Sequence, residues 1–229
     1  MCYFWFAGPM RRATVVTVIS ESTKSELKRW VGALADKVVV IPCCVRSEFT
    51  AERKAFNETA PVALQVGTGW NKNVQRVAES LTGTGCRLEI IGELTESQRT
   101  KLKASGTCFT ELGTISHEAV CEAYRRCDFV IFASVYEGFG LPIVEAQSIG
   151  RPVITSNCSS MPEVAGDAAL LVDPHSTASI RGAVMEIIKH PEVRESLIEK
   201  GFENIKRFSP EVVAASYGSI YERVLHAPR

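Results

Sequence analysis

The chain has 229 residues, of which 45% are hydrophobic and 23% are charged, a composition typical of a soluble globular protein with a large core. Its 26 basic and 26 acidic residues give a formal net charge of zero at pH 7, which argues against binding of nucleic acid or an acidic membrane by the whole molecule. The apolar N-terminus, residues 1–12, is too short to span a bilayer and lacks the basic region of a signal peptide. We therefore expect no transmembrane segment, no nucleic-acid partner, and phosphate binding only at a local site.

The eight cysteines do not predict a metal site or a set of disulfides. Cys43 and Cys44 are adjacent, the others are scattered, no C-x-x-C occurs, and no histidine stands at ligand spacing from a cysteine. We therefore expect no metal and interpret the cysteines as buried free thiols in a reducing cytosol. The expected location is cytoplasmic, with peripheral attachment at the inner membrane face as an alternative.

The first 45 residues predict one β-α-β unit. Residues 14–19 form a continuous β-branched run typical of a strand, and residues 37–41 form a second one that ends before a proline. Between them, Thr23 and Glu26 stand at capping-box spacing ahead of a helical apolar stripe. The polar residues 46–60 that follow are interpreted as a linker.

A second alternation of strands and helices begins at residue 61. Its period predicts a mostly parallel, doubly wound α/β sheet of the Rossmann-like type, covered by helices on both faces. Strands are expected at 62–66, 87–91, 108–112, 128–134, 152–155 and 168–172, and helices at 73–81, 97–104, 117–127, 142–149, 177–189, 191–207 and 209–225. The last helix has Ser209 as its predicted N-cap and Pro210 at its first position.

The most informative segment is EGFGLPIVE, in which Glu137 and Glu145 are eight positions apart. It follows a buried strand and leads into a short helix, with Pro142 at the first helical position and Gly150 just past the end. We expect Glu137 in the loop and Glu145 in the first helical turn, both at the carboxyl edge of the sheet, where open α/β folds bind ligands. The glycines between them allow backbone N–H groups to approach an anion. Two carboxylates around an anion site suit a nucleotide-sugar.

A second loop, from Gly67 to Asn73, follows the first strand of the large sheet. Gly67 and Gly69 permit close backbone approach, and Lys72 provides a cation near a helix N-terminus. A dinucleotide fingerprint requires a third glycine where Lys72 stands, and a phosphate-loop NTPase requires a Gly-Lys-Ser/Thr sequence. The alternative to phosphate binding is a plain glycine turn beside an exposed lysine.

Other strand ends supply weaker candidates. Gly92 and Gly113 follow the next two strands, and Gly113 lies near where a base could dock. The carboxylate of Glu93 could hold a ribose, although a solvated loop carboxylate is the interpretation we favour. Ser116 is explained as a helix N-cap, Glu163 as a helix-start carboxylate without chemistry, and His117 and His175 as surface-loop residues.

Taken together, these segments resemble the retaining, GT-B-fold glycosyltransferases of family 4, the glycosyl transferases group 1. The EGFGLPIVE run matches the E-x7-E element of that family, and the match extends over roughly residues 13–222. The other matching segments are residues 18–22, 40–42, 66–68, 72–73, 150–154, 162–166 and 171–174, together with Gly113 and Tyr124.

The resemblance implies a role for each matching residue. Glu145 would accept hydrogen bonds from ribose hydroxyls, and Glu137 would lie near the transferred sugar. Lys72 would neutralise the diphosphate leaving group of a UDP-, GDP- or ADP-sugar in place of a metal, with no cofactor and with retention at the anomeric carbon. The backbone amides of Gly138, Phe139, Gly140 and Leu141 would hold sugar and phosphate groups, and Gly67, Thr68, Gly92, Gly113 and Thr114 complete the expected donor-binding set.

The resemblance also divides the chain. Residues 1–45 would be the last part of an N-terminal acceptor domain, 46–60 a linker, 61–208 the nucleotide-sugar-binding domain, and 209–229 a helix that returns toward the N-terminal domain. One departure is that the family usually has an arginine or lysine where this chain has Thr68 and Gly69. The other is that most of the acceptor domain has no counterpart here, so a partner chain or further domain would supply it. The remaining expected partners are a nucleotide-sugar donor and a glycan or lipid-linked acceptor.

Three functions remain open from the sequence. The first is the donor-binding half of a hexosyltransferase, the second a non-catalytic nucleotide-sugar-binding or assembly module, and the third an NAD-dependent oxidoreductase that would use Gly67, Gly69 and Glu93. A corollary of the first two is that residues 4–6 or 15–19 should bury apolar side chains against something outside the chain.

Overall fold

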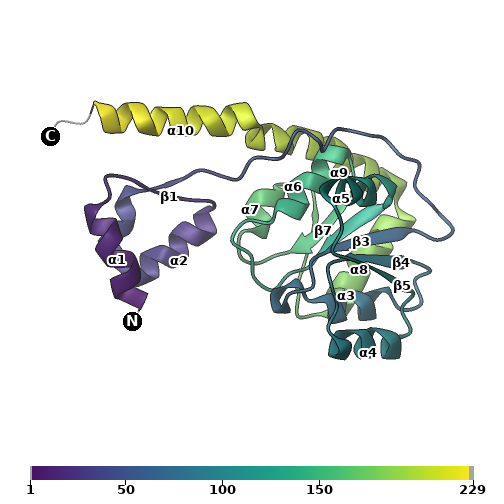
Figure 1. Ribbon diagram of the computed structural model, residues 1–229. Helices are drawn as coiled ribbons and strands as arrows, with labels where there is room; N and C mark the ends of the chain where they lie inside the picture. The colour runs from purple at the N-terminus through teal and green to yellow at the C-terminus, as the bar shows by residue number, and fades with distance from the viewer. Residues whose placement is uncertain (1, 227–229) are drawn as a thin grey trace.

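The computed structural model describes residues 2–226, with side chains from residue 7 onward, and it contains a two-stranded and a six-stranded sheet (Figure 1). The strands are β1 (Val16–Val18), β2 (Val38–Val40), β3 (Val62–Val66), β4 (Arg87–Ile91), β5 (Phe109–Gly113), β6 (Phe129–Phe132), β7 (Val153–Ser156) and β8 (Leu170–Val172). The α-helices are α1 (Cys2–Arg12), α2 (Glu21–Val31), α3 (Val74–Leu81), α4 (Glu96–Ser105), α5 (His117–Arg126), α6 (Leu141–Ile149), α7 (Met161–Ala165), α8 (Thr177–Lys189), α9 (Pro191–Asn204) and α10 (Pro210–Leu225). Short 3-10 turns are η1 (Gly32–Lys37), η2 (Trp70–Lys72) and η3 (Ile205–Phe208).

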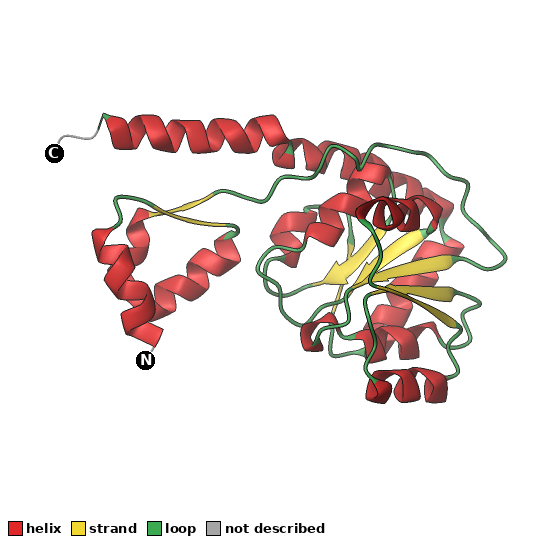
Figure 2. Ribbon diagram, viewed as in Figure 1, coloured by secondary structure: helices red, strands yellow, loops and turns green. Residues whose placement is uncertain are grey.

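The large sheet confirms the doubly wound α/β fold. Its strand order is β5-β4-β3-β6-β7-β8, and every neighbouring pair is parallel. One core cluster joins α3, α4 and α8 to one face, and the other joins α5, α6 and α7 to the opposite face (Figure 2). Because both faces are covered, the central strand β6 is buried along its whole length. The strand order reverses between β3 and β6, so the ligand crevice of this fold is expected at their carboxyl ends.

The first two strands form a separate small sheet. β1 and β2 pair in parallel, with Val16 opposite Val38, and α2 is their crossover helix. One face packs on α1 and α2, and the other packs on α10, where Val213 and Ile220 contact Ile41. Figure 1 shows α10 running back from the large sheet over this small one.

The expectation that residues 15–19 need an outside partner is wrong for most of them. Val15 packs near α10, and Val16 and Val18 pack against the α1–α2 cluster, while Ile19 is 38% exposed. The α10 helix, distant in sequence, supplies the missing cover. The side chains of residues 4–6 lie outside those described.

Residues 46–60 connect the sheets, but they are fixed along the large one. Phe49 is 5% exposed and meets the ring of Tyr124 edge-on. The buried carboxylate of Asp128 accepts the N–H of Asn57 at 3.0 Å and pairs with Lys54. These anchors hold the connection against the amino edge of the sheet, so it does not behave as a free polar linker.

Several local expectations are corrected. Residues 2–12, for which no element was expected, form α1. The N-cap of α2 is Ser20, whose hydroxyl accepts the N–H of Thr23, because the helix begins one turn earlier than the Thr23–Glu26 pattern suggested. In α6, Gly140 is the N-cap and Pro142 is the second helical residue, so Glu145 lies in the second turn rather than the first. Ser116 and Ser209 are N-caps as predicted.

The seven described cysteines are unpaired, but the expectation of buried thiols holds only in part. Cys86, Cys121 and Cys127 are buried, while Cys44 and Cys108 are exposed. Among the described residues, no helix has the length and hydropathy needed to cross a bilayer.

Candidate functional site

The loops after β3 and β6 meet at the point where the strand order reverses. The backbone N–H of Val135 donates to the carbonyl of Asn71 at 2.8 Å. Asn73 adopts φ = 57°, a left-handed conformation that asparagine tolerates better than most residues. Its buried amide donates to the carbonyls of Ala133, at 3.0 Å, and Pro174, at 2.7 Å. The loop after β3 is therefore fastened to the ends of β6 and β8.

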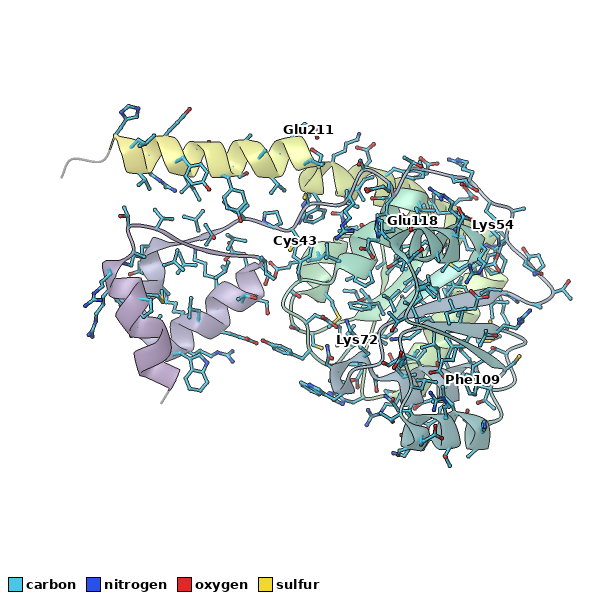
Figure 3. The ribbon with its side chains drawn as sticks, in the orientation of Figure 1. Cys43, Lys54, Lys72, Phe109, Glu118 and Glu211 are labelled. Carbon is cyan, nitrogen blue, oxygen red and sulfur yellow. The ribbon has the colours of Figure 1, made fainter. Side chains whose placement is uncertain are left out.

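Lys72 and Glu137, from these two loops, form an ion pair at the centre of the crevice. Lys72 Nζ lies 2.7 Å from Glu137 Oε1, and the side chains are only 20% and 14% exposed. The amide of Asn71 also donates to Glu137 Oε1, at 3.0 Å, and Lys72 Nζ lies 4.4 Å from the centre of the Phe132 ring. Lys72 is thus not the exposed lysine of a plain glycine turn. Figure 3 shows it on the side of the large sheet that faces α2.

Gly67 and Gln65 support the position of Lys72. Gly67 has φ = 88°, and a Cβ added there would lie 3.0 Å from Lys72 Cε. A side chain at Gly67 would therefore be strained and would displace the lysine. Gln65, a polar residue in the middle of the buried strand β3, donates its amide to the carbonyl of Lys72 at 3.1 Å.

The segment Gly138–Leu141 is held by its carbonyl groups. Ser159 and Ser160 donate to the carbonyl of Glu137, at 2.5 Å and 3.0 Å, and Ser20 donates to that of Gly138 at 2.7 Å. Within the residues that the structure describes, the N–H groups of Gly138, Phe139 and Gly140 have no hydrogen-bond acceptor. They precede the N-terminus of α6, so this loop can accept an anion, as expected from the two glycines.

Glu145 is held by a buried tyrosine. The hydroxyl of Tyr124, which is 0% exposed, donates to Glu145 Oε2 at 2.6 Å. Burial raises the pKa of Glu145, while the bond from Tyr124 and the nearby charges of Arg46 and Lys72 act to lower it. Burial and the neighbouring carboxylate raise the pKa of Tyr124, so its hydroxyl remains a donor. One carboxylate oxygen is thereby fixed, and no side chain or backbone group of the described residues donates to Oε1.

The glycines at the other strand ends lie along the same edge. The N–H of Gly67 donates to the carbonyl of Ile91 at 2.8 Å, and the N–H of Gly92 donates to that of Gly113 at 2.9 Å. The Thr68 hydroxyl donates to the carbonyl of Glu93 at 2.7 Å, and the Thr114 hydroxyl lies 3.3 Å from the Glu93 carboxylate. Glu93 is exposed, in agreement with the favoured interpretation of a solvated loop carboxylate, and the expected donor-binding residues share one edge of the sheet.

Two residues have roles that differ from those expected. Glu163 does lie in the first turn of α7, but its carboxylate accepts the N–H groups of Glu21 and Ser22, each at 3.0 Å, and so caps α2. His117 is the first residue of α5 rather than a loop residue, and its ring meets Phe49 edge-on. His175 is exposed outside any helix or strand, in agreement with the expectation.

Sequence reasoning missed the residues that hold the charged groups in place. Asn71, which donates to Glu137, lies in the Gly67–Asn73 loop but was given no role, and Gln65, which donates to the Lys72 carbonyl, belongs to no motif. Tyr124 was noted only as part of the resemblance. A signal was present for Gln65, because a polar residue in a buried strand needs a partner. For Tyr124 the signal was its place among the apolar positions of α5. Nothing in the sequence indicated that Ser159 and Ser160 would hold the Glu137 loop.

In the described part of the chain, no group of three or more His, Cys, Asp or Glu side chains is placed to hold a metal ion. The arrangement at the crevice instead offers one cation, unpaired N–H groups and two carboxylates. This set can neutralise and orient a ligand with an anionic part and a hydroxylated part.

Comparison with known proteins identifies the family. The model of the glycosyl transferases group 1 matches residues 47–204. The chain belongs to this family. The O-antigen chain mannosyltransferase B of Escherichia coli is 27% identical over 230 residues, which cover 87% of this chain and 58% of that protein. The MMP alpha-(1->4)-mannosyltransferase of Mycolicibacterium hassiacum is 23% identical over 94% of this chain and 55% of its own length.

Solved structures confirm the GT-B type of fold. Sucrose-phosphate synthase from Thermosynechococcus elongatus superposes with a TM-score of 0.83 at 23% identity, over 96% of this chain and 60% of that one. WaaG, a glycosyltransferase involved in lipopolysaccharide biosynthesis, superposes with a TM-score of 0.69 at 14% identity. The proteins named above match most of this chain, and the chain spans about three fifths of the length of each.

Proposed function

We propose that this chain binds a nucleoside diphosphate sugar at the carboxyl edge of its large sheet and supplies the donor half of a retaining hexosyltransferase. The observation that carries the proposal is the Lys72–Glu137 pair beside the unpaired N–H groups of residues 138–140. Mannosyl transfer is the favoured reaction, because the relatives matched over most of the chain are named mannosyltransferases. The acceptor is a glycan or a lipid-linked saccharide.

The proposed roles follow from the charges of the groups. The acceptor hydroxyl oxygen bonds to the anomeric carbon on the face from which the diphosphate departs, and the hydroxyl proton passes to the departing diphosphate. The remaining negative charge of that leaving group is met by Lys72, which turns to it from Glu137. The N–H groups of residues 138–141 share it, so the leaving group is stabilised by preorganised donors. Glu137, released from the lysine, accepts hydrogen bonds from hydroxyl groups of the sugar as positive charge develops on the sugar ring.

The remaining donor-binding residues act on the nucleoside. Glu145 Oε1 accepts a ribose hydroxyl, and Gly67, Gly92 and Gly113 let the nucleotide lie close to the sheet edge. Thr68 and Thr114 line the same approach. This mechanism needs no metal, because the cation and the N–H donors perform the neutralisation.

Two alternatives were left by the sequence. Membership of the glycosyl transferases group 1 removes the oxidoreductase. A non-catalytic nucleotide-sugar-binding module shares the same donor site and differs only in turnover. Transfer of radiolabelled sugar by this chain would exclude that module, and donor binding without transfer would support it.

A thermal-shift titration with GDP-mannose, UDP-glucose and ADP-glucose tests the donor site. A ligand at about 100 times its dissociation constant stabilises the folded state by about 2.7 kcal/mol. We expect one nucleotide to give a saturating rise of the unfolding midpoint that is lost in Glu145→Ala and Lys72→Met. Lys101→Met, an exposed lysine on α4, is the matched control. No rise with any of the three donors would contradict the proposal.

A further inference from the structure

Two exposed aromatic side chains flank the Lys72–Glu137 pair. Trp70 is 82% exposed, the largest value among the large hydrophobic side chains that the structure describes, and Tyr136 is 43% exposed. Trp70 lies two residues before Lys72, in η2, and Tyr136 immediately precedes Glu137. An indole left in water forgoes a large burial energy, so a ligand that covers it gains that energy.

The two loops that carry these rings are joined by hydrogen bonds. The backbone carbonyl of Asn71 accepts a hydrogen bond from the N–H of Val135 at 2.8 Å. The side-chain amide of Asn71 donates to the carbonyl of Tyr136 at 2.9 Å. Gln98, from α4, donates to the carbonyl of Thr68 at 2.8 Å. The aromatic rings are therefore presented by a fixed backbone, which lowers the entropy that a ligand must overcome on binding.

Tyr136 and the Lys72–Asn73 end of the Trp70 loop lie away from the β5 end of the sheet edge, where the nucleoside is proposed to bind. The Trp70 loop is fastened through Asn73 to the ends of β6 and β8, whereas Gly113 and Thr114 lie at the opposite edge, after β5. The side chain of Tyr136 extends toward the small-sheet unit, where its hydroxyl donates to Glu26 Oε2 of α2 at 2.8 Å. Tyr136 thus stands where the large sheet faces α2, and Trp70 lies two residues from Lys72, which is proposed to hold the diphosphate beside the sugar.

We infer that Trp70 and Tyr136 form an aromatic platform for the acceptor saccharide. The inference rests on the proposed function, because it assigns the acceptor to the sugar end of the donor site. A pyranose ring has one face of C–H groups that packs on an aromatic ring, and hydroxyl groups around its rim that require polar neighbours. Here Asn71 and Glu26 supply those neighbours, so the platform matches a saccharide better than a purely apolar ligand. A nucleobase could also stack on an indole, but Trp70 is two residues from Lys72 and its loop is bonded to the Tyr136 backbone, which favours the acceptor.

Saturation-transfer NMR of the full chain with α-mannobiose, maltose and lactose tests this inference. We expect the platform to bind at least one disaccharide. Trp70→Ala should weaken that binding about tenfold or more, because truncation of a central tryptophan removes most of the contact energy, while Trp70→Phe should retain much of it. Tyr221→Ala, which removes an aromatic side chain that is 64% exposed on α10, is the matched control and should bind as the native chain does.

The donor titration separates this inference from the proposed function. The same variants are titrated with the nucleotide-sugars, and Trp70→Ala should keep the donor stabilisation of the native chain. Loss of donor binding in Trp70→Ala would assign the indole to the nucleotide and overturn the inference. So would unchanged disaccharide binding in Trp70→Ala, or no binding of any of the three disaccharides by the native chain. The chain could bind a disaccharide through Trp70 and yet bind no nucleotide-sugar. That result would support the platform and refute only the proposed donor site.

Discussion

Replacement of Tyr124 by phenylalanine removes one hydrogen bond from a buried carboxylate and little else. The ring, which packs edge-on against Phe49 at 5.4 Å, is kept, and only the hydroxyl 2.6 Å from Glu145 is lost. A hydrogen bond to a charged group contributes about 1.5–3 kcal/mol. For a chain of this length, 1 kcal/mol corresponds to about 2–4 °C in the unfolding midpoint, so the variant should unfold about 3–12 °C below the native chain.

A double-mutant cycle separates this hydrogen bond from general damage to packing. Unfolding is measured by calorimetry for the native chain, Tyr124→Phe, Glu145→Gln and the combined variant. If the tyrosine acts through the charged carboxylate, Tyr124→Phe should cost markedly less free energy of unfolding in the Glu145→Gln background. The nucleotide-sugar titration should also weaken in Tyr124→Phe, because Glu145 is then less well oriented. An equal cost in both backgrounds would refute this reasoning.

The pH dependence gives an independent check with a definite sign. Burial raises the pKa of folded Glu145 above its ordinary value of 4.5, so the folded state binds more protons than the unfolded state above that pH. The contribution of Glu145 to stability therefore falls as pH rises from 4.5 through the raised pKa. Since the Tyr124 hydroxyl lowers that pKa, its loss extends the fall to higher pH. The cost of Tyr124→Phe should thus be larger near neutral pH than in acid, and a larger cost in acid would contradict the assignment.

Five further variants test the framework of the large sheet by denaturant unfolding. Asn73→Gly keeps the left-handed backbone but loses two buried hydrogen bonds, so it should cost about 1–3 kcal/mol, and Asn73→Ala should cost more because it adds backbone strain. Gly150→Ala combines φ = 85° with a Cβ 2.8 Å from Phe202 Cζ and should cost about 1–3 kcal/mol; an unchanged midpoint would refute the strain. Asp128→Asn leaves Lys54 without its buried partner and should cost about 3 kcal/mol, while Lys54→Met alone should cost less because Lys54 is 29% exposed.

The large sheet was predictable because its signals are local and repeated. Most strands contain a short apolar run at the expected spacing, and Ser116 and Ser209 mark helix starts by chemistry that acts over three residues. The same local reasoning failed for α2 and α6. The hydroxyl of Ser20 both caps α2 and donates to the carbonyl of Gly138, 118 residues away, so tertiary contact decides where that helix begins.

The charged residues of the site were predictable, but their partners were not. A motif names Lys72, Glu137 and Glu145 because each stands at a fixed distance from glycines and strand ends. That Lys72 pairs with Glu137, and that Glu145 pairs with Tyr124, depends on how β3, α5 and β6 pack, which no single segment encodes. The same holds for Glu163, which has the position of a helix-start carboxylate and instead caps a helix 142 residues earlier.

The charged side chains at the crevice, one lysine and two glutamates, limit how the proposed site can attract a diphosphate. Lys72 is already neutralised by Glu137, and Thr68 and Gly69 stand where the family usually has another cation, so long-range charge attraction is weak. Selectivity for an anion must come from short-range donors, namely the N–H groups of residues 138–140 at the start of α6. Such donors act only at contact, so binding depends on the exact placement of this loop. The hydrogen bonds that Ser20, Ser159 and Ser160 donate to carbonyl groups of this loop fix that placement, and Ser20 belongs to the small-sheet unit, as the N-cap of α2. The small-sheet unit, through Ser20, therefore contributes to the proposed donor site even though it supplies none of its charges.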